Sequence, residues 1–279
     1  MPWTSDHLTW LVDTGQPLKT ADGLNISTFE LRHENDELIL AAWAKHFRNN
    51  YCLDTEIDIL RGKTPRSDYL KNSIFPCHKT CPGPSVRAGD FAEILIADYV
   101  EFQLGFWVPR IRWRSKVVRN ESVKGCDVVG FRLGRNGKPM NDEMIIFECK
   151  AQFSTGKKSV LQNAINDSAK DELRIAETLN FLKRRFAETA DTTRISDIER
   201  FQNPNDQPYT EKYAAAAVIT RENFDPNEIR KVDASKIPTG KKGAVKTHPH
   251  RKKLQLIVIS GSEMMRLANE LYRRAADAA

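Results

Sequence analysis

The segment from Glu143 to Ser154 constrains the fold most, because its alternation predicts a strand inside a sheet. Successive side chains of a strand point to opposite faces. One face of this predicted strand begins with Met144 and Ile146 and becomes polar at Glu148 and Lys150. Charged side chains on an internal strand are costly to bury unless they are paired or bind a metal ion. The opposite face would carry an entirely apolar row suited to burial, made of Ile145, Phe147, Cys149, Ala151 and Phe153.

The preceding segment predicts the partner of this strand. Residues 126–133 alternate so that one side carries Asp127, Val129, Phe131 and Leu133. The Asn-Gly pair in the connection, at residues 136–137, is typical of a tight turn between antiparallel strands. Since the start of one strand of a hairpin lies beside the end of the other, we expect Asp127 next to Glu148 and Lys150.

Two carboxylates and an amine in this arrangement are what metal-dependent hydrolysis of a phosphodiester requires. Asp127 and Glu148 can hold Mg²⁺ or Mn²⁺, which prefer oxygen ligands, and a bound ion lowers the pKa of a coordinated water. Lys150 can orient that water or stabilise developing charge, and we expect its surroundings to favour the neutral amine. The alternative is an ordinary ion pair on a strand, worth well under about 1 kcal/mol.

A third candidate carboxylate, Glu93, comes from a predicted helix. The segment from Gly89 to Phe102 has helical spacing of apolar residues, is entered through a glycine and has Asp90 in the position of an N-cap. Glu93 would lie in the first turn, from where it could reach a site at the sheet. The alternative is that its carboxylate complements the helix dipole.

Four short segments together resemble a known family. A helix with a glutamate, then Asp127, then Glu148-Cys149-Lys150 and a long helix, is similar to the core of the PD-(D/E)xK nuclease superfamily. The four segments, spread over about residues 40 to 185, resemble the HamA family, the nuclease subunits of the Hachiman anti-phage defence system. They are WAKHFRNNY at residues 43–51, RAGDFAE at 87–93, KGCD at 124–127 and FECKA at 147–151.

The resemblance implies a DNA nuclease that is the effector subunit of a complex with a HamB-like helicase, held in check until phage or damaged DNA is sensed. It implies that Asp127, Glu148, the carbonyl of Cys149 and Glu93 bind Mg²⁺ or Mn²⁺ and that Lys150 assists the water. Asp127, Glu148, Lys150 and Glu93 would then be the catalytic residues. Cys126 stands where the superfamily motif has proline, at a position that varies widely.

Charge placement adds a candidate DNA contact. Lysine and arginine number 43 against 37 acidic residues, and the net charge of +6 fits a polyanionic partner. Strict alternation in residues 110–117 predicts a strand with one basic face. Phosphate contact is one interpretation of this face, and simple solvation is the other. The basic face consists of Arg110, Arg112, Arg114 and Lys116.

The remaining patterns predict a mixed α/β fold with a central mixed sheet flanked by helices. We expect the PD-(D/E)xK-like nuclease domain in residues 85–279, after a small α+β N-terminal region in residues 1–84. Further strands are expected at about residues 24–31, 213–220 and 254–260. Helices are expected at about residues 37–51, 159–190 and 262–276.

The five cysteines are odd in number and mostly isolated, and no apolar run is long enough for a signal peptide or a membrane span. We therefore expect a cytoplasmic enzyme without membrane association, namely a Mg²⁺-dependent deoxyribonuclease. Two alternatives stay open: a restriction or repair nuclease of the same superfamily, and a noncatalytic nucleic-acid-binding or scaffold subunit.

Overall fold

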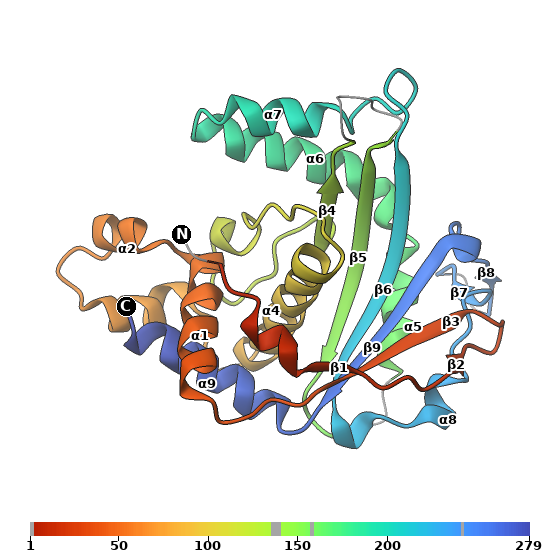
Figure 1. Ribbon diagram of the computed structural model, residues 1–279, viewed down its shortest axis with the longest axis horizontal. Coiled ribbons are helices and arrows are strands. Elements are labelled where there is room, and N and C mark those ends of the chain that lie inside the picture. The colour runs from red at the N-terminus through yellow and green to blue at the C-terminus, as the bar shows by residue number, and fades with distance from the viewer. Residues whose placement is uncertain (1–2, 135–140, 157–158, 241–242) are drawn as a thin grey trace.

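The computed structural model of the chain describes residues 3–134, 141–156, 159–240 and 243–279. A mixed sheet forms the centre and helices cover both of its faces (Figure 1), which confirms the expected fold class. The strands are β1 (Leu11–Asp13), β2 (Leu18–Lys19), β3 (Asn25–Leu31), β4 (Val128–Arg132), β5 (Glu143–Gln152), β6 (Thr210–Thr220), β7 (Ile237–Pro238), β8 (Val245–Lys246) and β9 (Leu254–Gly261). The helices are α1 (Glu37–Tyr51), α2 (Asp54–Leu60), α3 (Arg66–Tyr69), α4 (Gly83–Asp98), α5 (Val160–Ser168), α6 (Asp171–Glu188), α7 (Thr192–Glu199), α8 (Pro226–Ile229) and α9 (Met264–Asp277).

The main sheet has the order β1, β3, β9, β6, β5, β4, with β2 beside β3. Strands β3, β9, β6 and β5 are parallel, and β4 is antiparallel to β5 at one edge. In that pair Val128 lies opposite Phe147 and Arg132 opposite Glu143. The predicted hairpin is therefore confirmed. Its expected Asn-Gly turn falls on residues 135–140, which lie outside the described residues.

The two faces of β5 enter two separate apolar cores. Ile145, Phe147 and Cys149 pack under helices α1, α4 and α9. Met144 and Ile146 pack on the opposite face, under α5, α6 and α7. The parity predicted from the sequence is thus confirmed. Glu148 therefore lies on the same face of β5 as Met144 and Ile146, at the point where the apolar residues of that face end.

The N-terminal region shares the sheet and the core with the rest of the chain. Strand β3 pairs with β9 between the long parallel strands and the short edge strand β1. Helix α1 matches the predicted range and packs against α9 (Figure 1). Its N-cap is Asp36, whose carboxylate accepts hydrogen bonds from the amides of Leu38 and Ile39. A domain boundary between residues 84 and 85 stays a prediction.

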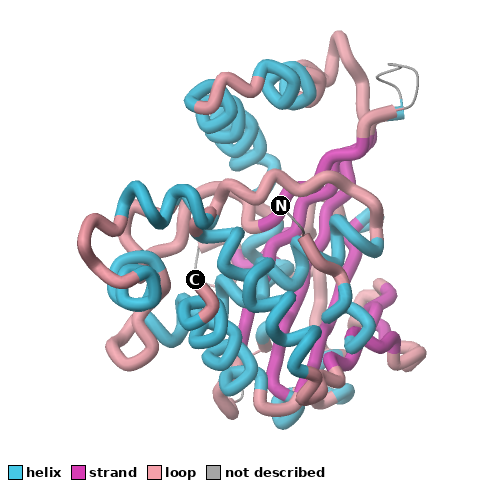
Figure 2. Tube along the Cα trace, turned by 60° about the vertical axis from the view of Figure 1, so that its left-hand side comes forward, coloured by secondary structure: helices cyan, strands magenta, loops and turns pink. Residues whose placement is uncertain are grey.

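Helices α6 and α7 project together beyond one end of the sheet in both views (Figures 1 and 2). The expectation of one continuous helix over residues 159–190 is wrong, because α5 ends at Ser168 and α6 begins at Asp171. The break redirects the chain while it is still beside β5. As a result the end of α5 and the start of α6 both contribute side chains to this strand.

Helix α4 begins earlier than the sequence suggests. It starts at Gly83, with Pro84 in its first turn, where the amide that proline lacks has no partner within the helix. The prediction that Asp90 is the N-cap is therefore wrong. Asp90 lies inside the helix, is buried and contacts Lys116 and the hydroxyl of Tyr51.

Candidate active site

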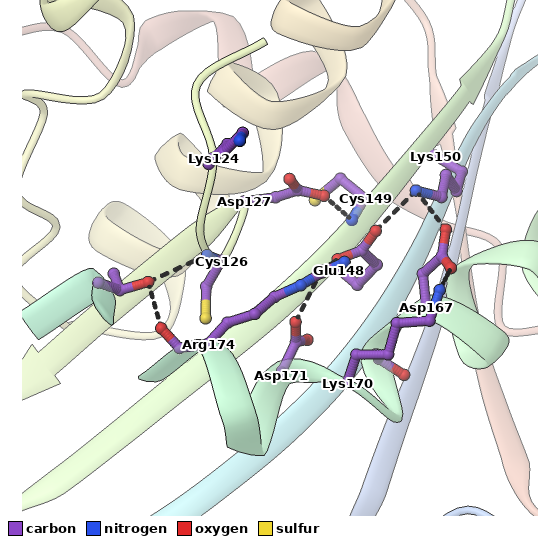
Figure 3. Close-up of polar contacts among 12 residues, drawn as sticks. Lys124, Cys126, Asp127, Glu148, Cys149, Lys150, Asp167, Lys170, Asp171 and Arg174 are labelled. Atoms are coloured by element: carbon purple, nitrogen blue, oxygen red, sulfur yellow. Dashed lines mark hydrogen bonds and ion pairs between the residues drawn. The ribbon is translucent and has the colours of Figure 1, made fainter. Parts of the chain in front are cut away.

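Asp127 and Glu148 lie opposite each other at the end of the β4–β5 ladder. Asp127 directly precedes Val128, which pairs with Phe147, so the antiparallel register sets Asp127 against Glu148. The Oδ2 atom of Asp127 accepts a hydrogen bond of 2.9 Å from the amide of Cys149 (Figure 3). The structure therefore brings Asp127 beside Glu148, as the sequence predicts.

Lys150 forms an ion pair with the Glu148 carboxylate. Its Nζ lies 2.6 Å from Oε1 of Glu148 and 2.9 Å from Oδ2 of Asp167, at the end of α5 (Figure 3). Burial lowers the pKa of Lys150, but the attraction of Glu148 and the bonds to both acids outweigh it and raise the pKa above its usual range. Two carboxylates therefore hold the ammonium form in this arrangement, and the neutral amine expected beside a bound metal ion stays a prediction.

Asp171 and Arg174, in the first turn of α6, complete the surroundings of Glu148. The Nη1 atom of Arg174 lies 3.0 Å from Oε2 of Glu148 and 3.3 Å from Oδ1 of Asp171. Asp171 is fully buried. Burial, reinforced by the negative charges of Glu148 and Asp127, raises the pKa of Asp171 to about 8. Burial also raises the pKa of Glu148, and Asp127 adds to that effect.

Glu93 reaches the site through an arginine. Its Oε2 atom accepts hydrogen bonds from Arg112 Nε at 3.2 Å and from Trp113 Nε1 at 3.1 Å, and Arg112 Nη2 lies 3.1 Å from Oδ1 of Asp127. Burial raises the pKa of Glu93 to about 8, with a contribution from Asp127. Glu93 lies well inside α4, so the expectation that it occupies the first turn is wrong.

The loop before β4 is fixed by helix α6. The backbone of Gly125 has φ +106°, a conformation that side chains rarely adopt, and a Cβ atom there would lie 2.9 Å from Thr178 Oγ1. The same hydroxyl accepts a hydrogen bond of 3.1 Å from the amide of Cys126 and donates one to the carbonyl of Arg174. The turn of α6 that carries Arg174 therefore also sets the position of Asp127.

The predicted basic strand at residues 110–117 is wrong. This segment forms turns and a short 3₁₀ helix, Trp113–Ser115. Each of the four cations of the alternating pattern instead pairs with an acid from another element or loop. A role of these four basic side chains in DNA contact stays a prediction. The strand face that suggested this role is not formed. Arg110 pairs with Asp98 and Glu101, Arg112 with Glu93 and Asp127, Arg114 with Glu56, and Lys116 with Asp90.

The donor atoms of the site suit a hard divalent ion. Asp127 and Glu148 supply carboxylate oxygens and mutual repulsion that a cation would relieve. Within the described ranges no three histidine, cysteine, aspartate or glutamate side chains converge closely enough to hold an ion together. Arg112 stands between Glu93 and Asp127, and Arg174 bridges Glu148 and Asp171. The thiol of Cys149 is buried in the opposite core, so this residue could contribute its carbonyl alone.

Sequence reasoning missed Asp167, Asp171 and Arg174 as members of the site. Their spacing of four and then three residues would place them on one face of the single helix that the sequence predicts, although the structure divides them between the end of α5 and the start of α6. This pattern, in the first helical segment after β5, was the signal in the sequence that could have identified them.

One comparison with known proteins, a family profile, supports the resemblance found in the sequence. No curated protein gives a significant match to the chain. In the ranges that the structure describes, none of the helices has the length and apolar character that a membrane span needs. The HamA family profile matches residues 6–275, nearly the whole chain. The chain therefore belongs to the HamA family, which ties it to Hachiman anti-phage defence.

Proposed function

We propose that this chain is a Mg²⁺- or Mn²⁺-dependent DNA nuclease and the effector of a complex with a helicase subunit. The observation that carries the proposal is the meeting of Asp127, Glu148 and Lys150 where β4 and β5 join. Family membership supports the defence role. The site offers two oxygen donors beside a cationic amine, as phosphodiester hydrolysis needs.

In this proposal Asp127 and Glu148 hold the metal ion, together with the carbonyl of Cys149, and Glu93 completes the acidic cluster through Arg112. The ion, when bound, would polarise the phosphate and make a coordinated water acidic. The ammonium group of Lys150, held between Glu148 and Asp167, is placed to donate a hydrogen bond to a negatively charged oxygen in the reaction.

The test is DNA cleavage by the purified chain, alone and with its helicase partner, in Mg²⁺, in Mn²⁺ and in excess chelator. We expect cleavage that requires the ion, that Glu148→Gln abolishes, and that Lys150→Ala lowers at least about a hundredfold. Lys183→Ala is the matched control, because Lys183 pairs with Glu199 on the surface between α6 and α7. It should cleave like the wild type.

The rival function is a noncatalytic DNA-binding or scaffold subunit. It would be supported by DNA binding that survives in Glu148→Gln, with no ion-dependent cleavage by the wild type in any of these conditions. That result would exclude the nuclease.

A further inference from the structure

We propose that residues 245–253 form a surface that binds the phosphate backbone of DNA beside the candidate active site, through Lys246, Lys252 and Lys253. The choice of DNA as the polyanion rests on the proposed function. The surface adds a contact to the substrate that lies outside the carboxylates at the end of the β4–β5 ladder.

The positive net charge of the chain comes from the segment that contains this surface. Residues 236–253 hold seven lysines and arginines and no acidic residue. The rest of the chain therefore holds 36 of the 43 basic residues against all 37 acidic residues, so that its net charge is −1 while that of the whole chain is +6. A concentration of charge of one sign attracts a polyanion whatever the sequence of that polyanion.

The rest of the fold holds the backbone of residues 248–253 in place. The amide of His248 donates a hydrogen bond of 2.8 Å to the carbonyl of Ala234. The Nε atom of Arg251 lies 2.6 Å from Oδ2 of Asp22, in the turn between β2 and β3. A surface that is fixed before a ligand arrives loses little conformational freedom when it binds.

The three lysines of this surface face solvent without an acidic partner. Lys246, Lys252 and Lys253 are exposed, and no carboxylate in the described part of the chain lies within ion-pair distance of their amines. Arg251, in contrast, is paired with an acid and is therefore not counted as a DNA contact. The segment is concave, because residues 247–253 line a hollow of about 400 Å³. Amines that are not paired within the protein can exchange their counterions for phosphate groups.

Two consecutive residues of α5 connect this surface to the candidate active site. Oδ2 of Asp167 lies 2.9 Å from Nζ of Lys150 (Figure 3). Oγ of the next residue, Ser168, lies 3.0 Å from Nε2 of His248. Lys170, whose side chain is 59% exposed, adds positive charge at the break between α5 and α6. We therefore expect a strand bound at Lys150 to continue past the end of α5 onto the basic surface.

DNA binding by the full-length chain in excess chelator tests the surface without cleavage, with the fluorescence anisotropy of two labelled duplexes of unrelated sequence as the readout. We expect the triple variant Lys246→Gln, Lys252→Gln, Lys253→Gln to bind at least about tenfold more weakly than the wild type at about 0.1 M salt. The plot of log affinity against log salt concentration should become less steep by about three, or about one for each lysine. Both duplexes should lose affinity equally, because phosphate contacts carry no sequence information.

The triple variant Lys45→Gln, Lys63→Gln, Lys79→Gln is the matched control. These lysines are also exposed and form no ion pair among the described residues, but they belong to the layer of α1, α2 and α4. The control loses the same charge and should bind DNA like the wild type. The thermal unfolding midpoint of each triple variant should equal that of the wild type, since every substituted side chain is exposed.

Three results would overturn the proposed surface. They are wild-type affinity and salt dependence in the variant of residues 246, 252 and 253, as expected if this segment faces an acidic protein or an anionic membrane; equal losses in both triple variants; and no DNA binding by the wild type. Failure of the proposed function looks different. In that case no ion supports cleavage, while the wild type still binds DNA and the variant of residues 246, 252 and 253 still weakens that binding.

Discussion

His248 is a single residue whose protonation state is set by its neighbours. It is buried, its Nδ1 accepts a hydrogen bond from the amide of His250, and its Nε2 lies 3.0 Å from Ser168 Oγ at the end of α5. Since Nδ1 accepts, Nε2 carries the proton and donates to Ser168. Burial lowers the pKa of His248 to about 4, with further contributions from His250 and Lys246.

A pH dependence of stability follows from this lowered pKa. Because the folded pKa is below the usual value of about 6.5, the neutral ring stabilises the fold above that pH, and this contribution is lost as the pH falls toward about 4. Between about pH 7 and about pH 5 the free energy of unfolding in urea should fall less in His248→Gln than in the wild type, by up to about 2 kcal/mol.

His33→Gln is the control for this measurement, since His33 lies in an exposed contact with the carbonyl of Ser262. It should keep the pH slope of the wild type. A wild-type slope in His248→Gln would contradict the assignment of a buried neutral ring.

At the scale of elements, the loop before β4 depends on α6 through Gly125. We expect Gly125→Ala to lower the free energy of unfolding by about 1–3 kcal/mol, because it combines backbone strain with a collision against Thr178. It should also reduce cleavage, since Asp127 follows two residues later. Urea unfolding and the cleavage assay measure the two effects.

Gly23→Ala separates strain from collision. Gly23 has φ +90°, and no described atom lies within 4 Å of a Cβ built there. This variant should lose less stability than Gly125→Ala and should keep full cleavage. Equal losses in both measurements would show that the contact with Thr178 does not matter.

The elements that could be predicted from the sequence are those whose signal is local. Strand parity and the hairpin were predictable because residues 126–133 and 143–154 alternate regularly and neighbour each other in the chain. That local pattern was enough to bring Asp127 next to Glu148. Helix α1 was predictable because its apolar stripe is regular and Asp36 caps it.

The errors arose where distant residues decide the structure. Residues 110–117 alternate like a strand, yet pairing with Asp98, Glu93 and Asp90 fixes them as turns. The break between α5 and α6 occurs at Ala169 and Lys170, neither of which is a helix breaker. Asp171 and Arg174 were therefore read as part of one helix rather than as members of the site.

At the scale of the whole molecule, a buried polar network joins the N-terminal segment to the helix layer. Asp98, at the end of α4, contacts Nε2 of His7 at 2.9 Å, Nε2 of His46 at 2.8 Å and Nη2 of Arg110 at 2.6 Å. Asp98 and both histidines are completely buried. The histidines and the arginine together hold the pKa of Asp98 far below its usual range against the effect of burial.

This network predicts a large effect of a nearly isosteric change. Asp98→Asn should lower the free energy of unfolding by about 3 kcal/mol or more, because it leaves Arg110 with less buried counter-charge and cannot accept the hydrogen bonds of both histidines with its one remaining oxygen. Urea unfolding at neutral pH measures the loss.

Asp58→Asn provides the comparison, since Asp58 forms an exposed ion pair with Arg66. Its cost should be far smaller than that of Asp98→Asn, because solvent screens an exposed ion pair. A similarly small cost for Asp98→Asn would mean that the network does not hold the N-terminal segment in place.

The hydrogen bond from the Cys149 amide to Asp127 has a practical consequence. Strand β4 begins at Val128, and beyond that point the side chain of Asp127 occupies the edge of β5 where a neighbouring backbone would otherwise bond. One backbone proton thus touches a proposed metal ligand directly. In a spectrum of isotope-labelled protein, the resonance of this amide would shift as Asp127 gives up charge to an ion, before any DNA is added. This single amide would therefore report the arrival of the proposed ion at Asp127 separately from any effect of DNA.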